Sequence, residues 1–204
     1  MTTNAPSLEY LSARDTAKLV RAALKKAFPD QKFSVRSDTY SGGASIDVSW
    51  ADGPLASEVD VITERFSGAD FDGMIDLKTS RYHYLRPDGE VLLAFAPGTG
   101  GSGGSIPPED NRKLARVMPA DVRMVRFGAD YIFTRRTITD EDAQLSEAGA
   151  WLMANCKIEN SKPDARGIQY AMFGTEYVSD IARRLVYLRK TGEDWKAAFN
   201  RRYG

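Results

Sequence analysis

The sequence has very few of the side chains from which most metal and redox sites are built. It contains one cysteine, Cys156, and one histidine, His83, among 204 residues. A single cysteine excludes an intramolecular disulfide and any zinc or iron–sulfur site made of several cysteines. A single histidine restricts Ser-His-Asp and Cys-His catalysis to arrangements around His83. We expect Cys156 to be a small buried hydrophobe and the compartment to be reducing.

Net charge and long apolar runs are also missing. The 28 basic and 28 acidic side chains cancel, which excludes a uniformly cationic nucleic-acid coat and a highly anionic DNA mimic. No apolar run approaches the roughly 18 residues of a membrane-spanning helix, and the N-terminal residues lack the pattern of a secretory signal. We therefore expect a soluble cytoplasmic protein without a membrane partner.

Hydrophobic periodicity predicts an α+β fold. Apolar residues at helical spacing predict helices over 12–28, 54–67, 107–118 and 139–155, followed by two helices between 175 and 203 that separate near Thr191-Gly192. Alternating residues predict strands over 32–38, 44–50, 79–86, 90–95 and 122–137. Pro87-Asp88-Gly89 is a strong turn signal, and Gly128 breaks the last strand segment.

The order of these elements favours a mainly antiparallel sheet of hairpins with helices packed on one face, plus a helical C-terminal extension. We expect a core over 1–138 with a flexible glycine-rich insertion at 97–106, and an extension over 139–204 packed on that core. Thr139 is the expected N-cap of the first helix of the extension, because acidic residues follow it in the first turn.

The first predicted hairpin has one apolar and one polar face. The apolar face carries Phe33, Val35, Ile46, Val48 and Trp50, and the polar face carries Ser34, Arg36, Ser45, Asp47 and Ser49. Arg36 and Asp47 are expected to lie opposite each other across the two strands. His83 alternates with two tyrosines in "RYHYL", which is more typical of packing than of a general base.

A glycine cluster, "GTGGSGGSIPPEDN", fits the dinucleotide-binding spacing G-x-G-x-x-G at Gly98, Gly100 and Gly103. The expected helix begins too late for its amides to hold a phosphate, and Pro107 and Pro108 remove two of those amides. The acids that follow would repel a phosphate. We interpret this stretch as a flexible connection and expect no cofactor.

Acidic residues gather between 52 and 76, where seven carboxylates accompany one arginine. They form a candidate acidic binding patch made of Glu58, Asp60, Glu64, Asp70 and Asp72. The stretch "DFDGMID" also presents Asp70, Asp72 and Asp76 at a spacing that suits a hard cation, although the downstream ligands of an EF-hand are missing. A carboxylate-metal hydrolase or nuclease is therefore an alternative hypothesis, and an ordinary turn is the simpler interpretation.

Basic residues form a second candidate patch. Four of them share one side of the helix over 12–28, and seven lie between 181 and 204 against two acids. The candidate binding residues are Arg14, Lys18, Arg21, Lys25, Arg135, Arg136, Arg183, Arg184, Arg201 and Arg202. Nucleic acid is a possible partner here, and Tyr40, Tyr82, Tyr84 and Tyr131 would stack on bases if they were exposed. An ordinary solvated face is the alternative.

Four segments carry a resemblance to a known family: "ARDTAKLVRAALKKAFP", "KFSVRSDTYSGGASIDVSWADGP", "FDGMIDLKT" and "FGADYIFTRR". In this order they resemble the large polyvalent protein-associated domain family, member twenty-nine. The resemblance covers 12–79 and 127–136, and it leaves out 89–122 and the C-terminal helices. It implies a protein of phages or conjugative elements, and it supplies no catalytic residues.

Three functions follow as hypotheses. The first is a non-enzymatic interaction protein that binds a host protein, a nucleoprotein complex or nucleic acid, and acts as a counter-defence inhibitor such as an anti-CRISPR. The second is the carboxylate-metal hydrolase. The third is a structural module of a DNA-transfer or packaging apparatus, which predicts stable self-assembly.

Overall fold

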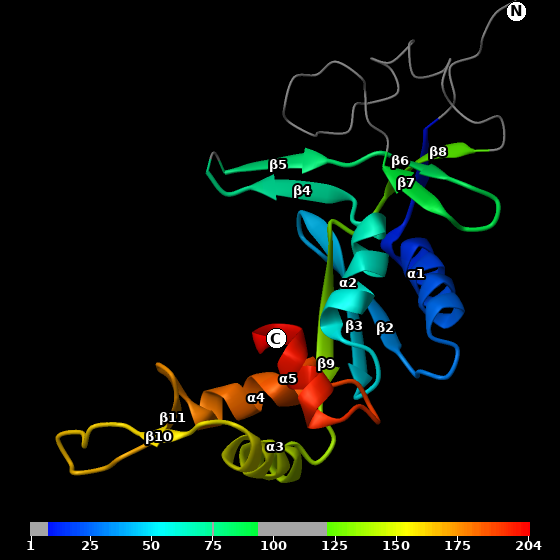
Figure 1. Ribbon diagram of the computed structural model, residues 1–204. Helices are drawn as coiled ribbons and strands as arrows, with labels where there is room; N and C mark the ends of the chain where they lie inside the picture. Colours follow the sequence, from blue (N-terminus) through cyan, green and yellow to red (C-terminus); the bar gives the residue numbers. More distant parts are fainter. Residues whose placement is uncertain (1–7, 75, 94–121) are drawn as a thin grey trace, which may run out of the picture. The chain divides into compact units, whose positions relative to one another are not determined.

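The computed structural model describes residues 8–74, 76–93 and 122–204 (Figure 1). The glycine-rich insertion at 97–106 and the helix expected over 107–118 lie outside these residues. Within them the chain has five α-helices and twelve strands in mostly antiparallel sheets. The predicted α+β class is confirmed.

The chain divides into two compact units. We call residues 1–50 with 56–135 the N-terminal unit, and residues 51–55 with 136–204 the C-terminal unit.

The N-terminal unit contains two α-helices, α1 (Ala13–Ala27) and α2 (Ala56–Thr63), and a short 3-10 helix, η1 (Glu64–Phe66). Its strands are β1 (Glu9–Leu11), β2 (Ser34–Tyr40), β3 (Gly43–Ala51), β4 (Ala69–Asp72), β5 (Leu77–Ser80), β6 (His83–Leu85), β7 (Val91–Leu93), β8 (Arg123–Phe127) and β9 (Tyr131–Thr137), of which β3 and β9 have their last residues in the C-terminal unit. They form sheets in the orders β1-β8-β6-β7, β2-β3-β9 and β4-β5. The β1–β8 pairing is parallel, and the β2–β3, β4–β5, β6–β7 and β6–β8 pairings are antiparallel.

Helix α1 forms because its apolar residues recur on one face and Ser12 caps its start. The Ser12 hydroxyl accepts a hydrogen bond from the Asp15 amide at 3.1 Å, which satisfies one of the amides left unpaired at a helix N-terminus. Ala17, Val20 and Leu24 are buried in the core of the unit. The helix packs against β2 and α2.

The hairpin of β2 and β3 has the predicted register. Arg36 lies opposite Asp47, and Val35, Ile46, Val48 and Trp50 are buried as predicted. Ser45 is a correction, since it is 7% exposed and not on an open polar face. Asp47, the next residue on the same face of β3, is exposed, so the polar face is covered at Ser45 and open at Asp47.

The remaining boundaries in this unit mostly agree with the sequence. Strands β6 and β7 are joined by the turn at Pro87-Asp88-Gly89, where the Gly89 amide donates to the Arg86 carbonyl at 3.0 Å. Strands β8 and β9 are separated at Gly128. The acidic stretch contains the turn that we expected, at residues 73, 74 and 76, and this turn joins the antiparallel pair β4 and β5, in which Asp70 lies opposite Thr79.

The C-terminal unit contains α3 (Glu141–Asn155), α4 (Val178–Leu188) and α5 (Trp195–Tyr203), and a small sheet of β10 (Glu159–Asn160), β11 (Ala171–Phe173) and β12 (Glu176–Tyr177). Its core includes Ala148, Leu152, Ile181 and Leu185. The sequence did not predict the small sheet.

The N-cap of α3 is a second correction. It is Asp140, which has a left-handed φ of 52°, and not Thr139. The Thr139 amide instead donates to the Asp52 carboxylate at 2.9 Å, so this residue belongs to the preceding loop.

Candidate functional site

A polar cleft of about 460 Å³ lies in the N-terminal unit. The polar side chains that define it are Tyr10, Tyr40, Lys78, Arg126 and Asp130. Two segments that carry the family resemblance line it, because Thr39 to Ala44 come from "TYSGGA" and Phe127 to Asp130 come from "FGAD". We call this hollow the polar cleft.

An ion pair lies in the polar cleft. Lys78 Nζ is 2.6 Å from Asp130 Oδ2, and the Asp130 side chain is 10% exposed. The hydrogen bond that Lys78 donates to the Asp130 carboxylate raises the pKa of Lys78, so the lysine is charged at neutral pH. The backbone fixes Asp130 in place, since its amide donates to the Ala44 carbonyl at 2.8 Å.

Two glycines let the backbone approach these groups closely. A Cβ at Gly43 would lie 2.3 Å from Asp130 Oδ2, and a Cβ at Gly128 would lie 2.6 Å from the Tyr10 hydroxyl. Neither position has room for a side chain without a shift of its neighbours. The two glycines therefore contribute to the shape of the polar cleft.

Tyr10 and Arg126 lie opposite each other in the parallel pair of β1 and β8. Tyr10 is 63% exposed and Tyr40 is 47% exposed. Arg126 Nε is buried and has no hydrogen-bond partner among the residues that the structure describes, a condition that costs free energy unless an acceptor reaches it. The polar cleft thus presents two accessible aromatic rings and a guanidinium with an unsatisfied donor.

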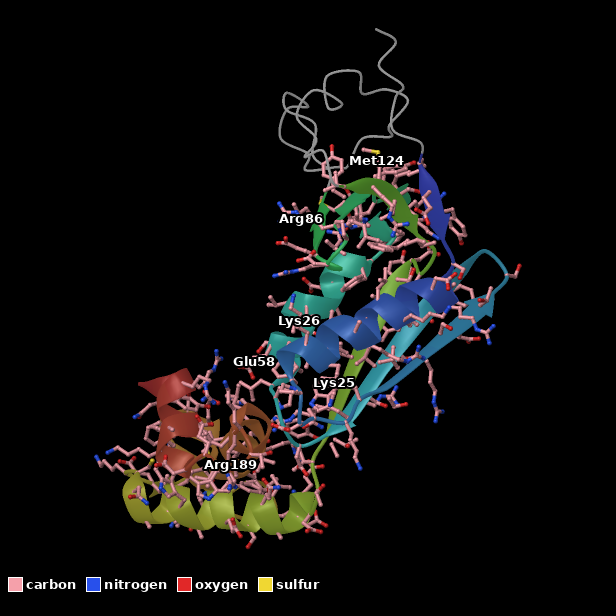
Figure 2. All side chains as sticks on the ribbon, turned by 90° about the vertical axis from the view of Figure 1, so that its right-hand side faces the viewer. Lys25, Lys26, Glu58, Arg86, Met124 and Arg189 are labelled. Atoms are coloured by element: carbon pink, nitrogen blue, oxygen red, sulfur yellow. The ribbon has the colours of Figure 1, made fainter. Side chains whose placement is uncertain are left out.

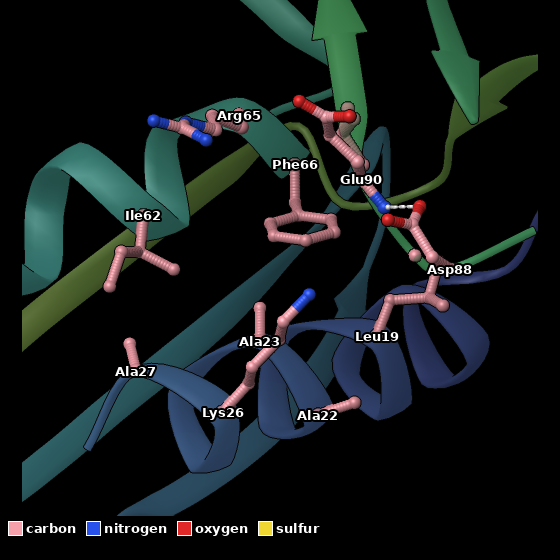
Figure 3. Close-up of a pocket in the computed structure, with 12 residues that line it drawn as sticks. Leu19, Ala22, Ala23, Lys26, Ala27, Ile62, Arg65, Phe66, Asp88 and Glu90 are labelled. Carbon is pink, nitrogen blue, oxygen red and sulfur yellow. Dashed lines mark hydrogen bonds between the residues drawn. The ribbon is translucent and has the colours of Figure 1, made fainter. Parts of the chain in front are cut away.

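A second hollow, of about 590 Å³, is mainly apolar (Figure 3). Leu19 and Ala23 of α1, Ile62 of α2 and Phe66 of η1 line its apolar part. Lys26, Arg65, Asp88 and Glu90 stand at its rim, and the dashed line in Figure 3 joins the Glu90 amide to the Asp88 carboxylate at 3.0 Å. Its lining is that of a hydrophobic binding groove, and the residues named here do not form a catalytic arrangement.

The four basic residues predicted on α1 are all exposed, and the labelled Lys25 in Figure 2 marks their helix. Three of them already have partners. Lys18 pairs with Asp15 at 2.7 Å, Arg21 donates to the Val35 carbonyl at 2.5 Å, and Lys25 donates to the Pro29 carbonyl. These contacts give the basic residues of α1 a structural role in addition to their charge.

The other predicted basic residues are divided between the two units. Arg135 is exposed in the N-terminal unit, and Arg183 and Arg202 are exposed in the C-terminal unit. Arg184 pairs with Glu176, and Arg201 pairs with Glu193. These two ion pairs neutralise part of the expected basic tail.

Arg136 is the basic residue whose placement differs most from the expectation. Its guanidinium donates to four carbonyl oxygens, those of Asp52 at 2.9 Å, Gly53 at 3.3 Å, Tyr187 at 2.7 Å and Arg189 at 2.8 Å. This arrangement ties together three segments of the C-terminal unit. We therefore assign Arg136 a structural role.

The predicted acidic residues come from α2, η1 and β4, and several are engaged locally. Asp60 accepts from the Thr134 hydroxyl at 2.5 Å, Asp70 pairs with Arg81 at 2.8 Å, and Asp72 accepts from the Met74 amide at 2.9 Å. Glu58 is half-buried and Glu64 is exposed. Across 8–74, 76–93 and 122–204, no three His, Cys, Asp or Glu side chains form a group that would hold a metal. Asp70, Asp72 and Asp76 therefore give the hydrolase hypothesis no metal centre there.

The aromatic and reactive residues are placed as follows. Tyr84 is 9% exposed, so it does not offer a stacking surface, whereas Tyr82 and Tyr131 are half-buried. His83 is buried, its ring lies 4.8 Å from that of Phe127, and burial lowers the pKa of His83 to about 3. Cys156 is half-buried against the core of the C-terminal unit, and burial raises its pKa.

Sequence reasoning missed the polar cleft itself. It did not select Tyr10, Lys78, Arg126 or Asp130, and it treated Tyr40 only as a possible stacking surface. The available signal was the pair of segments "TYSGGA" and "FGAD" in the family resemblance, whose glycines hinted at a close backbone approach.

Comparisons with known proteins give one match. Residues 11–139 match the family described as large polyvalent protein associated domain 29. No curated protein and no solved structure matches. In the described part of the chain, no helix is long and apolar enough to cross a membrane. Because the match spans more than half of the 204 residues and includes most of the polar cleft, the chain belongs to the large polyvalent protein associated domain 29 family.

Proposed function

We propose that this chain is a non-enzymatic interaction protein of a phage or another mobile element, and that it binds a host protein through the β4–β5 ribbon. The ribbon comprises β4, β5 and the turn between them. The family supports the mobile-element context. A counter-defence inhibitor, such as an anti-CRISPR, is the form of this function that we consider first.

The exposed apolar side chains of the ribbon carry the proposal. Met74 is 95% exposed, Phe71 is 54% exposed and Leu77 is 48% exposed. Within the described residues, β4 and β5 pair only with each other. An isolated two-stranded ribbon is marginally stable in water, and soluble proteins seldom gather large apolar side chains on such an element unless a partner covers them.

The base of the ribbon is anchored while its turn projects apolar groups. Lys78 of β5 pairs with Asp130, and Arg81, directly after β5, pairs with Asp70 of β4. The Arg81 amide also donates to the Gly68 carbonyl at 2.8 Å. This anchoring reduces the entropy that docking would cost, because strands β4 and β5 are held in place before a partner arrives.

The charge of the ribbon narrows the class of partner. Asp72 and Asp76 are exposed near the turn, and no ion pair within the described residues involves either of them. A protein pocket that is apolar inside and basic at its rim complements this surface. The ribbon accounts for two members of the predicted acidic patch, Asp70 and Asp72.

Affinity capture from host lysate, with and without nuclease treatment, tests the proposal. We expect Met74→Asp to abolish capture of the partner, because it places a charge where an apolar contact would form. Met153→Asp is the matched control, since Met153 is 57% exposed on α3, and capture should persist. Equal capture by both variants would count against the ribbon, and loss of capture after nuclease treatment would indicate a nucleic-acid partner instead.

The other hypotheses predict different outcomes. A structural module would form a stable oligomer in size-exclusion chromatography without any host component. A metal-dependent hydrolase would gain thermal stability with divalent ions, and Asp72→Ala would lose that gain. A counter-defence inhibitor would restore phage growth when it is expressed in a host with the matching defence system, and Met74→Asp would remove the effect.

A further inference from the structure

We propose that the polar cleft binds one nucleotide unit, with the phosphate at Arg126 and the base against Tyr10 or Tyr40. This site is separate from the exposed turn of the ribbon, and the inference does not depend on the proposed protein partner.

The charge balance of the polar cleft favours an anion. Lys78 and Asp130 neutralise each other at 2.6 Å, which leaves the guanidinium of Arg126 as an additional positive charge. No acceptor in the described part of the chain reaches the buried Arg126 Nε. A phosphate oxygen would supply the missing acceptor, and the planar fork of arginine suits the geometry of phosphate.

The start of α1 adds to this preference. Ser12, its N-cap, and Ala13, its first residue, both line the polar cleft. The first turn of a fifteen-residue helix carries partial positive charge. The nearest acid on this helix, Asp15, already accepts from the Ser12 hydroxyl at 2.7 Å and pairs with Lys18 at 2.7 Å. Its charge is therefore compensated locally.

The two tyrosines supply surfaces for a planar base. A Cβ at Gly128 would lie 2.6 Å from the Tyr10 hydroxyl, and a Cβ at Gly43 would lie 3.1 Å from the Tyr40 ring, so each tyrosine packs next to a glycine. Both side chains line the polar cleft and remain accessible. Stacking of a base on such a ring tolerates every base, because each base has a π-face.

The remaining polar groups and the size fit the same ligand. The hydroxyl of Thr39 and the Lys78–Asp130 pair offer both donors and acceptors to a sugar or to the edge of a base. A volume of about 460 Å³ lies within the range of small-molecule sites. This fits one nucleotide, either free or as one unit of a strand.

Titration calorimetry with the full chain tests the inference. The probes are AMP, adenosine, inorganic phosphate and a 5′-phosphorylated oligothymidylate. We expect AMP or the oligonucleotide to bind, adenosine and phosphate to bind at least tenfold more weakly, and affinity to fall with salt. Comparable binding of AMP and the oligonucleotide would identify a free nucleotide as sufficient, and binding of the oligonucleotide alone would identify a strand.

Two substitutions and one control test where the ligand binds. Arg126→Met should weaken binding of the phosphate-bearing probe at least tenfold, and Tyr10→Leu should weaken it about fivefold or more. Arg123→Met is the control on the same strand, because Arg123 is exposed and pairs with Glu9, and it should leave affinity unchanged. Tyr10 is exposed enough for Tyr10→Leu to fold even if Arg126→Met does not.

The inference fails if neither phosphate-bearing probe binds at millimolar concentration, or if adenosine binds as tightly as AMP. It also fails if neither Tyr10→Leu nor the corresponding Tyr40→Leu weakens binding more than Arg123→Met does. Met74→Asp should bind the nucleotide probes normally, so failure of the ribbon proposal and failure of this one are distinguishable.

Discussion

Lys78 Nζ and Asp130 Oδ2 form an ion pair at 2.6 Å between residues that are 52 positions apart in the chain. The pair links β5 to the loop that follows β8. Its two sides are unequal, because the Lys78 side chain is 39% exposed whereas that of Asp130 is 10% exposed. This difference in exposure determines which of the two substitutions should lower the free energy of unfolding more.

Lys78→Met should lower the free energy of unfolding by about 1–3 kcal/mol, because it leaves the carboxylate of Asp130 buried without its partner. Asp130→Asn should cost less, since Lys78 is exposed enough to be hydrated. Urea unfolding of both variants measures the difference. Lys18→Met is the control, because the exposed Lys18–Asp15 pair should contribute less than about 1 kcal/mol. Equal losses of unfolding free energy in all three variants would contradict the view that Asp130 is the buried member of the pair.

Gly43→Ala should disturb the polar cleft more than its small size suggests. The added Cβ would lie 2.3 Å from Asp130 Oδ2, so the carboxylate or the β3 backbone must shift. We expect a loss of about 1–3 kcal/mol of stability. Gly73→Ala is the matched control, because its Cβ would meet no atom closer than 3.8 Å and the position does not have a positive φ. A comparison of the two melting temperatures checks this, and similar values would argue against a tight approach at Gly43.

His83 should make the protein less stable in mild acid. Its pKa is about 3 in the folded chain, mainly because of burial, against an ordinary value of 6.5. The unfolded chain therefore binds a proton between these two values while the folded chain does not, so stability falls as the pH falls below 6.5. At pH 5 the loss from this group alone is about 2 kcal/mol.

His83→Phe keeps an aromatic ring beside Phe127 and removes the titration. We expect the difference in unfolding free energy between wild type and variant to depend on pH between 7 and 5 as described, with the variant losing less. A constant difference across this range would contradict a neutral buried His83.

The parts of the fold that the sequence predicted are those governed by local patterns. The β2–β3 register, with Arg36 opposite Asp47, follows from strict alternation around a glycine turn. Ser45 escaped this reasoning because alternation assumes one open face and does not tell which part of that face the rest of the chain covers; Asp47 on the same face is exposed. Strands β4 and β5 were missed because Asp and Gly are poor strand formers, so the segment resembled a turn or a metal loop.

Local sequence patterns of this kind could not predict the polar cleft. Tyr10 and Arg126 meet through a parallel pairing of strands far apart in sequence, and Lys78 of β5 meets Asp130 in the loop that follows β8. No local periodicity specifies which distant strands pair. Among the basic residues the error was to include one residue too many. Charge spacing alone did not distinguish the exposed Arg135 from Arg136, whose guanidinium is hydrogen-bonded inside the C-terminal unit.

Arg136→Lys should destabilise the C-terminal unit by about 2 kcal/mol or more. A lysine keeps the charge, but its single ammonium does not reproduce a planar fork that donates to carbonyls at 2.7 to 3.3 Å in four directions. Because those carbonyls belong to residues 52–53 and 187–189, the loss should appear as faster amide hydrogen exchange in both segments.

Arg135→Lys is the control for Arg136→Lys, because it makes the same substitution at the neighbouring, exposed position. Arg135 is exposed, and we expect its replacement to change stability by less than about 0.5 kcal/mol. Hydrogen exchange should then stay at the wild-type rate around Gly53 and Arg189. If the two variants exchanged alike, Arg136 would not be the residue that holds these segments together, and its place among the candidate binding arginines would be restored.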